Sequence, residues 1–211
     1  NSLEQVPNHL GLHFSPFLFL LVPGYVIFQS PYFLLFIQTI AIAFGAWPLY
    51  YLAKQKLSSL WSLVIVAGYL LYPGLQWTNI YDFHEIPFFI PLMLAALYFL
   101  EEKKFGWASL FLVLSASVKE DAILAVLFVG VYVLLLKIPK SKLFAIAVIV
   151  ISFLYFFLAV QVIMPSLGGG VLRFDRYANL GENPAAIVKN VAADPLLLPK
   201  TVFSGEKLQY L

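Results

Sequence analysis

Three short groups of polar residues in this chain have the types and spacing that acid–base or metal chemistry requires. The first is Asp82-Phe83-His84-Glu85, in which a helical backbone would set two carboxylates one turn apart beside an imidazole. Carboxylates and imidazoles move protons and bind divalent cations. We therefore predict that Asp82 and Glu85 are catalytic and that Asp82, His84 and Glu85 are metal ligands. The alternative is that Asp82-x-x-Glu85 is a capping box, which begins a helix and needs no function.

The second group is Lys119-Glu120-Asp121, which stands between two apolar stretches. Charged side chains within a membrane are rare and mark functional sites more often than not. We predict that Glu120 and Asp121 are catalytic carboxylates and that Lys119 contacts a lipid phosphate. The alternatives are a solvated turn between two helices or an internal Lys–Glu pair.

The third group is His13 with Ser15 and Pro16. Serine followed by proline is typical of the start of a helix. Because His13 falls on the same side of the membrane as the acidic groups, we predict that it helps to bind a lipid phosphate. A purely structural histidine at the interface is the alternative. In the C-terminal part, Arg173, Arg176 and Tyr177 have the chemistry to meet an anionic head group, but a solvated tail is the favoured interpretation.

Long apolar stretches must position these groups. Hydrophobic residues make up 62% of the 211 residues, charged residues make up 11%, and the mean hydropathy is +0.88. Soluble domains contain about 25% charged residues, so this composition indicates an integral membrane protein. The net charge of +2 is small and the lysines are dispersed, which argues against a nucleic-acid partner. The absence of cysteine excludes disulfides and zinc–thiolate sites.

We predict an all-α polytopic bundle of about six membrane spans, preceded by one interfacial helix at 14–28. The predicted spans are 32–53, 60–77, 86–100, 105–118, 122–136 and 143–164. The fourth and fifth cover only about 21–23 Å as helices, less than the roughly 30 Å of the hydrocarbon core. Residues 119–121 between them would then lie in a recess below the membrane surface. One long helix through 105–136 is the alternative, and it would bury three charges in mid-bilayer.

Lysines recur in alternate loops, at 54–56, 101–104 and 137–142. Cytoplasmic loops of membrane proteins are enriched in lysine and arginine. We therefore predict a multi-pass protein of the cell membrane with these loops in the cytoplasm and the acidic and histidine loops outside. The predicted division is a transmembrane domain at 1–164 and an extracytoplasmic tail at 165–211 that contains a short helix at 185–193. Because the sequence starts at Asn1, we expect an internal piece of a longer protein.

Several motifs in this order resemble the DUF2079 family of prokaryotic membrane proteins, over nearly the whole chain. They are His13-Phe14-Ser15-Pro16, Gln38 with Gly45-Ala46-Trp47-Pro48-Leu49-Tyr50, Tyr81-Asp82-Phe83-His84-Glu85 and Val118-Lys119-Glu120-Asp121. The layout of that family is similar to the GT-C superfamily of polytopic glycosyltransferases, which use lipid-phosphate sugar donors at the outer face. An interfacial helix followed by a full span, as at 16–28 and 32–53, resembles the arrangement of those enzymes.

The resemblance implies a glycosyltransferase that takes a sugar from a polyprenyl-phosphate donor at the extracytoplasmic face, with a divalent cation (Mg or Mn) as the possible cofactor. GT-C enzymes carry a key acidic residue in the first outer loop, and this chain begins after that point, so the first span and that acid would lie upstream. Two alternatives stay open. One is a transporter or flippase that uses the same acids and histidines as a proton or ion relay, and the other is a scaffold subunit without activity.

Overall fold

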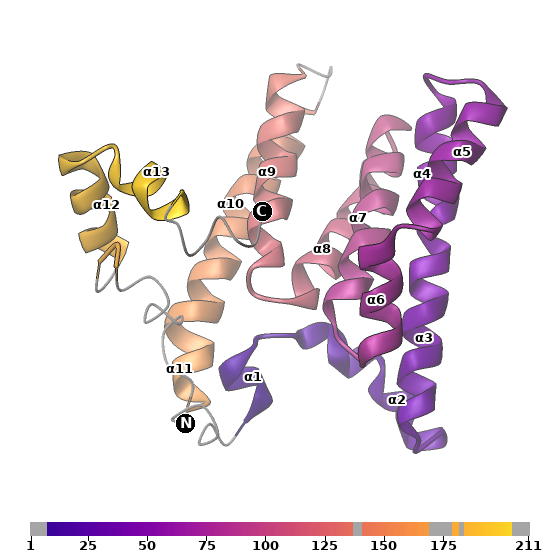
Figure 1. Ribbon diagram of the computed structural model, residues 1–211, viewed down its shortest axis with the longest axis horizontal. Helices are drawn as coiled ribbons and strands as arrows, with labels where there is room; N and C mark the ends of the chain where they lie inside the picture. The colour runs from indigo at the N-terminus through magenta and orange to yellow at the C-terminus, as the bar shows by residue number, and fades with distance from the viewer. Residues whose placement is uncertain (1–7, 137–140, 169–178, 182–183, 204–211) are drawn as a thin grey trace. The chain divides into compact units, whose positions relative to one another are not determined.

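The computed structural model describes residues 8–136, 141–168, 179–181 and 184–203, and all regular structure in these residues is helical, which confirms the predicted all-α class (Figure 1). The chain divides into two units, Asn1–Gly169 and Gly170–Leu211. The helices of the first unit are α1 (His9–Leu12), η2 (Pro16–Leu20), α2 (Val22–Ile27), α3 (Pro31–Phe44), α4 (Ala46–Lys54), α5 (Ser59–Leu70), α6 (Pro73–Tyr81), α7 (Ile86–Glu101), α8 (Phe105–Val118), α9 (Ala122–Leu135), α10 (Lys142–Leu158), η3 (Ala159–Ile163) and α11 (Met164–Ser166).

Two helices are long and apolar enough to cross a membrane by length and composition. They run over Pro31–Lys54, which combines α3 and α4, and over Lys142–Ser166, which combines α10, η3 and α11. A third candidate is the pair α5 and α6, which is bent by 41°. The described residues thus contain two or three helices of spanning length, fewer than the six spans predicted.

The predicted span at 60–77 is broken rather than continuous. Its break lies at Leu71 and Tyr72, and Tyr72 has the extended conformation (φ −60°, ψ 119°). Proline disfavours a helical conformation in the residue before it and has no N–H to continue the ladder of hydrogen bonds. Pro73 therefore ends one helix and begins the next.

The predicted interfacial helix at 14–28 is likewise two short helices, η2 and α2, joined at Leu21. Each has a proline in its first turn, Pro16 in η2 and Pro23 in α2. Because Pro23 has no N–H to donate to the preceding turn, the 3₁₀-helix cannot run on through it and a new helix starts.

Helices α7, α8 and α9 are apolar but have only 16, 14 and 14 residues. The last two are about 21 Å long. Helix α8 ends at Val118 and Lys119 is extended (φ −161°, ψ 157°), so the alternative of one long helix through 105–136 is wrong. In Figure 1 the α8–α9 connection lies above the lower end of α3. Helices α1 and η2 pass beneath this connection.

The bundle has two chemically different ends. In Figure 1 the C-terminal ends of α4, α7 and α9 lie at the upper end, and the α6–α7 and α8–α9 connections point toward the lower end. Lys54, Lys103 and Lys104 therefore lie at the opposite end from the acidic groups. This arrangement agrees with the predicted alternation of the loops, while the side of the membrane that each end faces stays a prediction.

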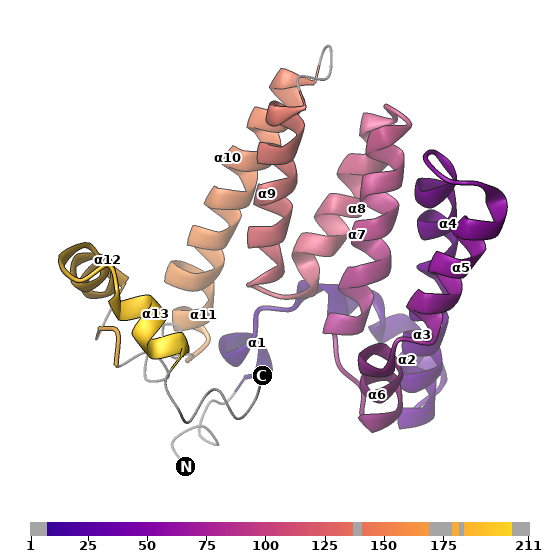
Figure 2. The same cartoon turned by 45° about the horizontal axis from the view of Figure 1, so that its top comes forward.

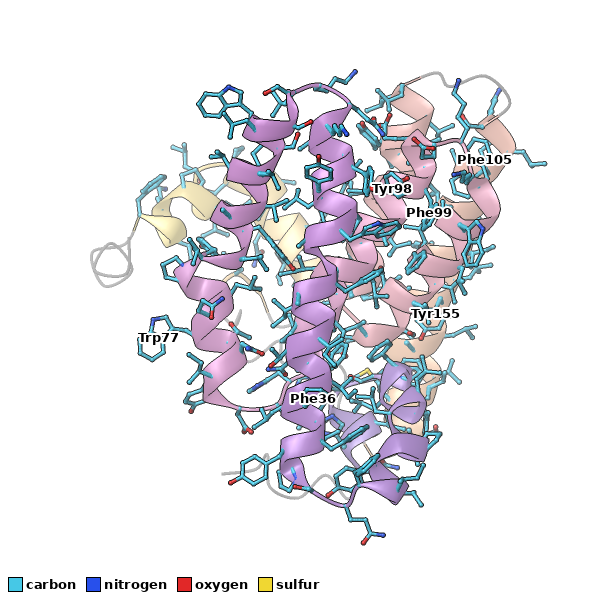
Figure 3. The ribbon with its side chains drawn as sticks, turned by 90° about the vertical axis from the view of Figure 1, so that its right-hand side faces the viewer. Phe36, Trp77, Tyr98, Phe99, Phe105 and Tyr155 are labelled. Carbon is cyan, nitrogen blue, oxygen red and sulfur yellow. The ribbon has the colours of Figure 1, made fainter. Side chains whose placement is uncertain are left out.

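Small residues form much of the packing between helices, as is usual where helices meet inside a membrane. The core of α7, α8, α9 and α10 consists of Ala96, Leu100, Ala108, Leu112, Val126, Val129, Val133 and Ala145. At Gly130 a Cβ atom would lie 2.9 Å from the Ala145 carbonyl oxygen, so glycine is what lets α9 and α10 approach closely. Many large apolar side chains point away from the bundle, among them Phe36 and Trp77, which Figure 3 labels. Such an outer surface suits contact with lipid chains.

The second unit contains α12 (Pro184–Ala193) and α13 (Leu197–Val202), and α12 confirms the helix predicted at 185–193. Asn190 donates a hydrogen bond from its side-chain amide to the carbonyl of Leu180 (2.9 Å). Arg173, Arg176 and Tyr177 lie outside the described residues.

Candidate functional site

The site is built on a contact between the N-terminal segment and the α8–α9 turn. The imidazole Nδ1 of His13 lies 3.0 Å from Oε1 of Glu120, and the backbone N–H of Phe14 donates to Oε2 of the same carboxylate at 2.9 Å. Glu120 is only 7% exposed. Both oxygens of this buried carboxylate are therefore held by consecutive residues of a segment more than a hundred positions away in the sequence.

Glu120 is held in its charged form. Burial raises the pKa of its carboxyl group, but the hydrogen bond with His13, a backbone hydrogen bond, and the charges of His13 and Lys119 together outweigh burial, so the pKa lies below its usual value. An ionised carboxylate only accepts hydrogen bonds, so Nδ1 of His13 carries the proton that they share. In the neutral ring, Nε2 is then the nitrogen with a free lone pair, directed away from Glu120.

Lys119 connects the same turn to the α6–α7 connection. Its Nζ lies 3.7 Å from Oε1 of Glu85, and the two side chains are 19% and 11% exposed. When one partner of a mostly buried ion pair is removed, the other charge is left buried without compensation, which is strongly destabilising. Lys119 and Glu120, which are neighbours in one turn, thus contact different parts of the chain. Together with their partners they form one cluster, here called the polar cluster, which consists of His13, Glu85, Lys119 and Glu120.

Gln38 of α3 fixes the α6–α7 connection from the other side. Its side chain is fully buried, and its Oε1 accepts a hydrogen bond from the backbone N–H of His84 (3.0 Å). Its Nε2 donates to the carbonyls of Thr78 and Asp82, at 3.4 Å each. No role for Gln38 is predicted from the sequence, although a single amide in an otherwise apolar span is a signal of a buried polar contact.

The other predicted site residues are not brought into the polar cluster. Asp82 is exposed, and its Oδ1 accepts a hydrogen bond from the N–H of Phe83 at 2.7 Å. Asp121 is exposed, and its side chain does not cap α9. His84 lines an open hollow of about 370 Å³ with Trp77, Thr78, Tyr81 and Ile86. The capping-box alternative for Asp82 and Glu85 is wrong, because α7 begins at Ile86 without a side-chain cap.

The described residues do not fit the divalent cation that the family resemblance implies. Among them, no group of three or more His, Asp or Glu side chains is placed to hold a metal ion. The predicted ligands Asp82, His84 and Glu85 diverge, since Glu85 turns to Lys119 while the first two stay exposed. A cation that bridges these three would require a rearrangement of this connection.

Ser15 is the last member of the N-terminal segment with unusual surroundings. It precedes η2 as predicted, and its backbone carbonyl accepts from the N–H of Leu18 (3.1 Å). Its hydroxyl does not cap the helix; it is fully buried and has no hydrogen-bond partner among the residues that the structure describes. A buried hydroxyl without a partner costs stability, so Ser15 is a polar group available to a ligand or a water molecule.

Comparison with curated proteins and with solved structures finds no match. A family model described as a predicted membrane protein, DUF2079, matches residues 1–211. This match covers all four of the motifs that carry the sequence resemblance, including those that contain His13, Glu85, Lys119 and Glu120. The chain therefore belongs to the DUF2079 family of predicted membrane proteins.

Proposed function

We propose that this membrane protein is a glycosyltransferase that takes a sugar from a polyprenyl-phosphate donor at the end of the bundle that carries the polar cluster. The observation that carries the proposal is the His13–Glu120 pair, in which a buried, ionised carboxylate orients an imidazole. A carboxylate that accepts from Nδ1 fixes the tautomer and orientation of the ring, and leaves Nε2 to take a proton, as in other acid–histidine pairs.

The geometry supports His13, rather than Glu120, as the general base. Both oxygens of Glu120 are already hydrogen-bonded, and the side chain is nearly inaccessible, whereas that of His13 is 31% exposed. In the proposed reaction Nε2 of His13 takes the proton of an acceptor hydroxyl as its oxygen attacks the anomeric carbon. The bond from that carbon to the phosphate oxygen breaks, and its electron pair leaves on the polyprenyl phosphate.

Lys119 is the cation that would offset the charge of the departing phosphate. It is partly exposed and adjacent to Glu120, so a phosphate bound beside the turn would compete with Glu85 for its ammonium group. Asp82 and Asp121 are exposed on the same end of the bundle and are proposed to contact the acceptor rather than to act as bases.

The test is a transfer assay with the full-length protein in membrane vesicles and a panel of radiolabelled polyprenyl-phosphate hexoses. Replacement of His13 by Ala or of Glu120 by Gln is expected to lower the release of polyprenyl phosphate by 10²-fold or more, the usual range for loss of a general base. His9→Ala is the matched control, since His9 is an exposed histidine of α1 whose ring lies beside that of His13 (centroids 6.1 Å apart), and this variant is expected to retain activity.

The same vesicles distinguish the alternative functions. Proton flux that depends on His13 and Glu120, with no release of polyprenyl phosphate from any donor, would replace the transferase by a relay. Wild-type cell phenotype in both variants would instead indicate a scaffold.

A further inference from the structure

An apolar groove runs along the bundle and ends at the polar cluster. Its walls are α8 and α10, with Val126 of α9 at its base, and its volume is about 270 Å³. The middle of the groove is lined by Leu112, Ala116, Ala147 and Val148. Figure 2 shows α10, α9 and α8 one after another, with α1 beneath them.

The groove is open along one side. Val113 of α8 and Ile151 of α10, which form its lips, are 64% and 63% exposed. On α8 it extends from Ser109 to Ser117, eight residues apart, or about 12 Å along the helix axis. Because these helices lie in an apolar bundle, a hydrocarbon chain in the surrounding bilayer reaches the groove sideways, without crossing water.

At one end the groove meets the N-terminal segment. Ser117 and Tyr155 line this end, and Figure 3 shows Tyr155 on the side of Phe99 and Phe105 that lies toward the N-terminal helices. The rings of Tyr155 and Phe14 are in contact, with their centroids 5.9 Å apart. The N–H of Phe14 in turn donates to Glu120 (2.9 Å). One residue, Phe14, thus closes the groove and holds the carboxylate that orients His13.

A groove of apolar side chains that ends beside charged side chains suits an amphiphile, a ligand with an apolar chain and a charged head group. We propose that the groove binds the first isoprene units of the polyprenyl-phosphate substrate, so that its phosphate emerges between Tyr155 and the α8–α9 turn, beside Lys119 and His13. This inference rests on the proposed function and adds the position of the lipid. The occupant has one chain because the groove has room for one chain, whereas a phospholipid of the bilayer brings two.

The experiment measures occupancy without turnover. The full-length protein in nanodiscs is photolabelled with farnesyl phosphate that carries a benzophenone at the end of its chain, and the labelled peptides are mapped. We expect saturable labelling within α8 and α10. Ala147→Phe, which fills the groove, should lower it by at least tenfold, and Ala67→Phe, which adds the same ring to an exposed position of α5, should not.

Two further measurements keep the result interpretable. Val113→Trp obstructs the groove from its exposed lip and should lower labelling even if Ala147→Phe does not fold. Phosphatidic acid, a two-chain lipid with the same phosphate chemistry, should compete poorly. Equal competition by phosphatidic acid, or labels outside α8, α9 and α10, would overturn the proposal.

Failure of this proposal and failure of the transferase function are distinguishable. Labelling reports occupancy of the groove by farnesyl phosphate, which carries no sugar to transfer, so the two readouts are independent in the wild type and in the groove variants. Intact labelling without transfer by the wild type would support the groove and contradict the transferase. Transfer that survives in Ala147→Phe and Val113→Trp would support the transferase and contradict the groove as the lipid site.

Discussion

At the scale of single residues, the chemistry depends on a carboxylate that is buried and yet ionised. Glu120 tolerates burial because its oxygens accept from the His13 imidazole and the Phe14 amide. Removal of one partner would leave a buried charge with too few hydrogen bonds, which costs far more than loss of an exposed pair. The same environment predicts how the stability of the protein depends on pH.

The lowered pKa of Glu120 predicts a loss of stability in acid. Its stabilising contribution is complete above the ordinary value of 4.5 and disappears as the pH falls through the lower pKa of the folded state. Thermal unfolding in detergent between about pH 6 and about pH 3 should show a smaller decrease in Tm for Glu120→Gln than for the wild type. Asp121→Asn, at the exposed neighbour, is the control and should follow the wild type. Equal slopes for all three proteins would contradict the lowered pKa.

The types of the site residues could be predicted from the sequence, but their pairing could not. Glu120, Lys119, Glu85 and His13 are all candidates by type and by their position beside apolar stretches. Periodicity and spacing report on neighbours within a few residues, whereas His13 and Glu120 are 107 positions apart. Their roles therefore follow only from the fold, which makes His13 the accessible group and Glu120 its partner.

At the scale of the elements, α3 positions the α6–α7 connection through one side chain. Gln38 is the fully buried residue of α3 that binds the backbone of residues 78, 82 and 84. Through this connection it also positions Glu85, the partner of Lys119. The amide of Gln38 thus adds a polar link between α3 and the polar cluster to the apolar packing of Ile37 and Ala41 against the core cluster that contains Val118.

Gln38→Leu should destabilise the protein by roughly 1–3 kcal/mol, because the N–H of His84 loses its acceptor in a partly buried place. Thermal unfolding of the purified protein measures the change. Thr39→Val is the matched control on the next residue, which is exposed and bonds to Leu35 and Asn79. Its effect should stay within about 0.5 kcal/mol. Similar effects of the two substitutions would show that the amide of Gln38 does not hold the connection.

The elements themselves differ in how well sequence patterns predict them. Helices α8 and α9 are predicted because three successive charges interrupt their apolar pattern. The break between α5 and α6 is missed although Pro73 marks it, since apolar residues continue on both sides and hydropathy does not respond to a missing N–H. The same reason explains the division of 14–28 into η2 and α2.

At the scale of the whole molecule, Lys54, Lys103 and Lys104 lie at the opposite end of the bundle from the polar cluster. The absence of cysteine allows a direct test with His84→Cys, Asp121→Cys and Lys103→Cys in the full-length protein. We expect a membrane-impermeant thiol reagent added to intact cells to label positions 84 and 121 and not 103, because the lysine end is predicted to be cytoplasmic. Position 121 is chosen over 120 because Glu120 is buried. Label at 103 alone would reverse the orientation, and label at 84 without 121 would contradict a common end.

The distance in sequence between His13 and Glu120 also has a consequence in time. Ribosomes add about 5–20 residues per second, so the 107 positions between the two residues correspond to roughly 5–20 s of synthesis. Throughout that interval the N-terminal segment has been made but its partner has not. The two residues can meet only after the α8–α9 turn has been made, so the polar cluster assembles later than contacts among the helices that precede α8 can form. Substitutions that delay insertion of the α8–α9 hairpin are therefore expected to act on the cluster during biogenesis, even when they lie far from it in the folded protein.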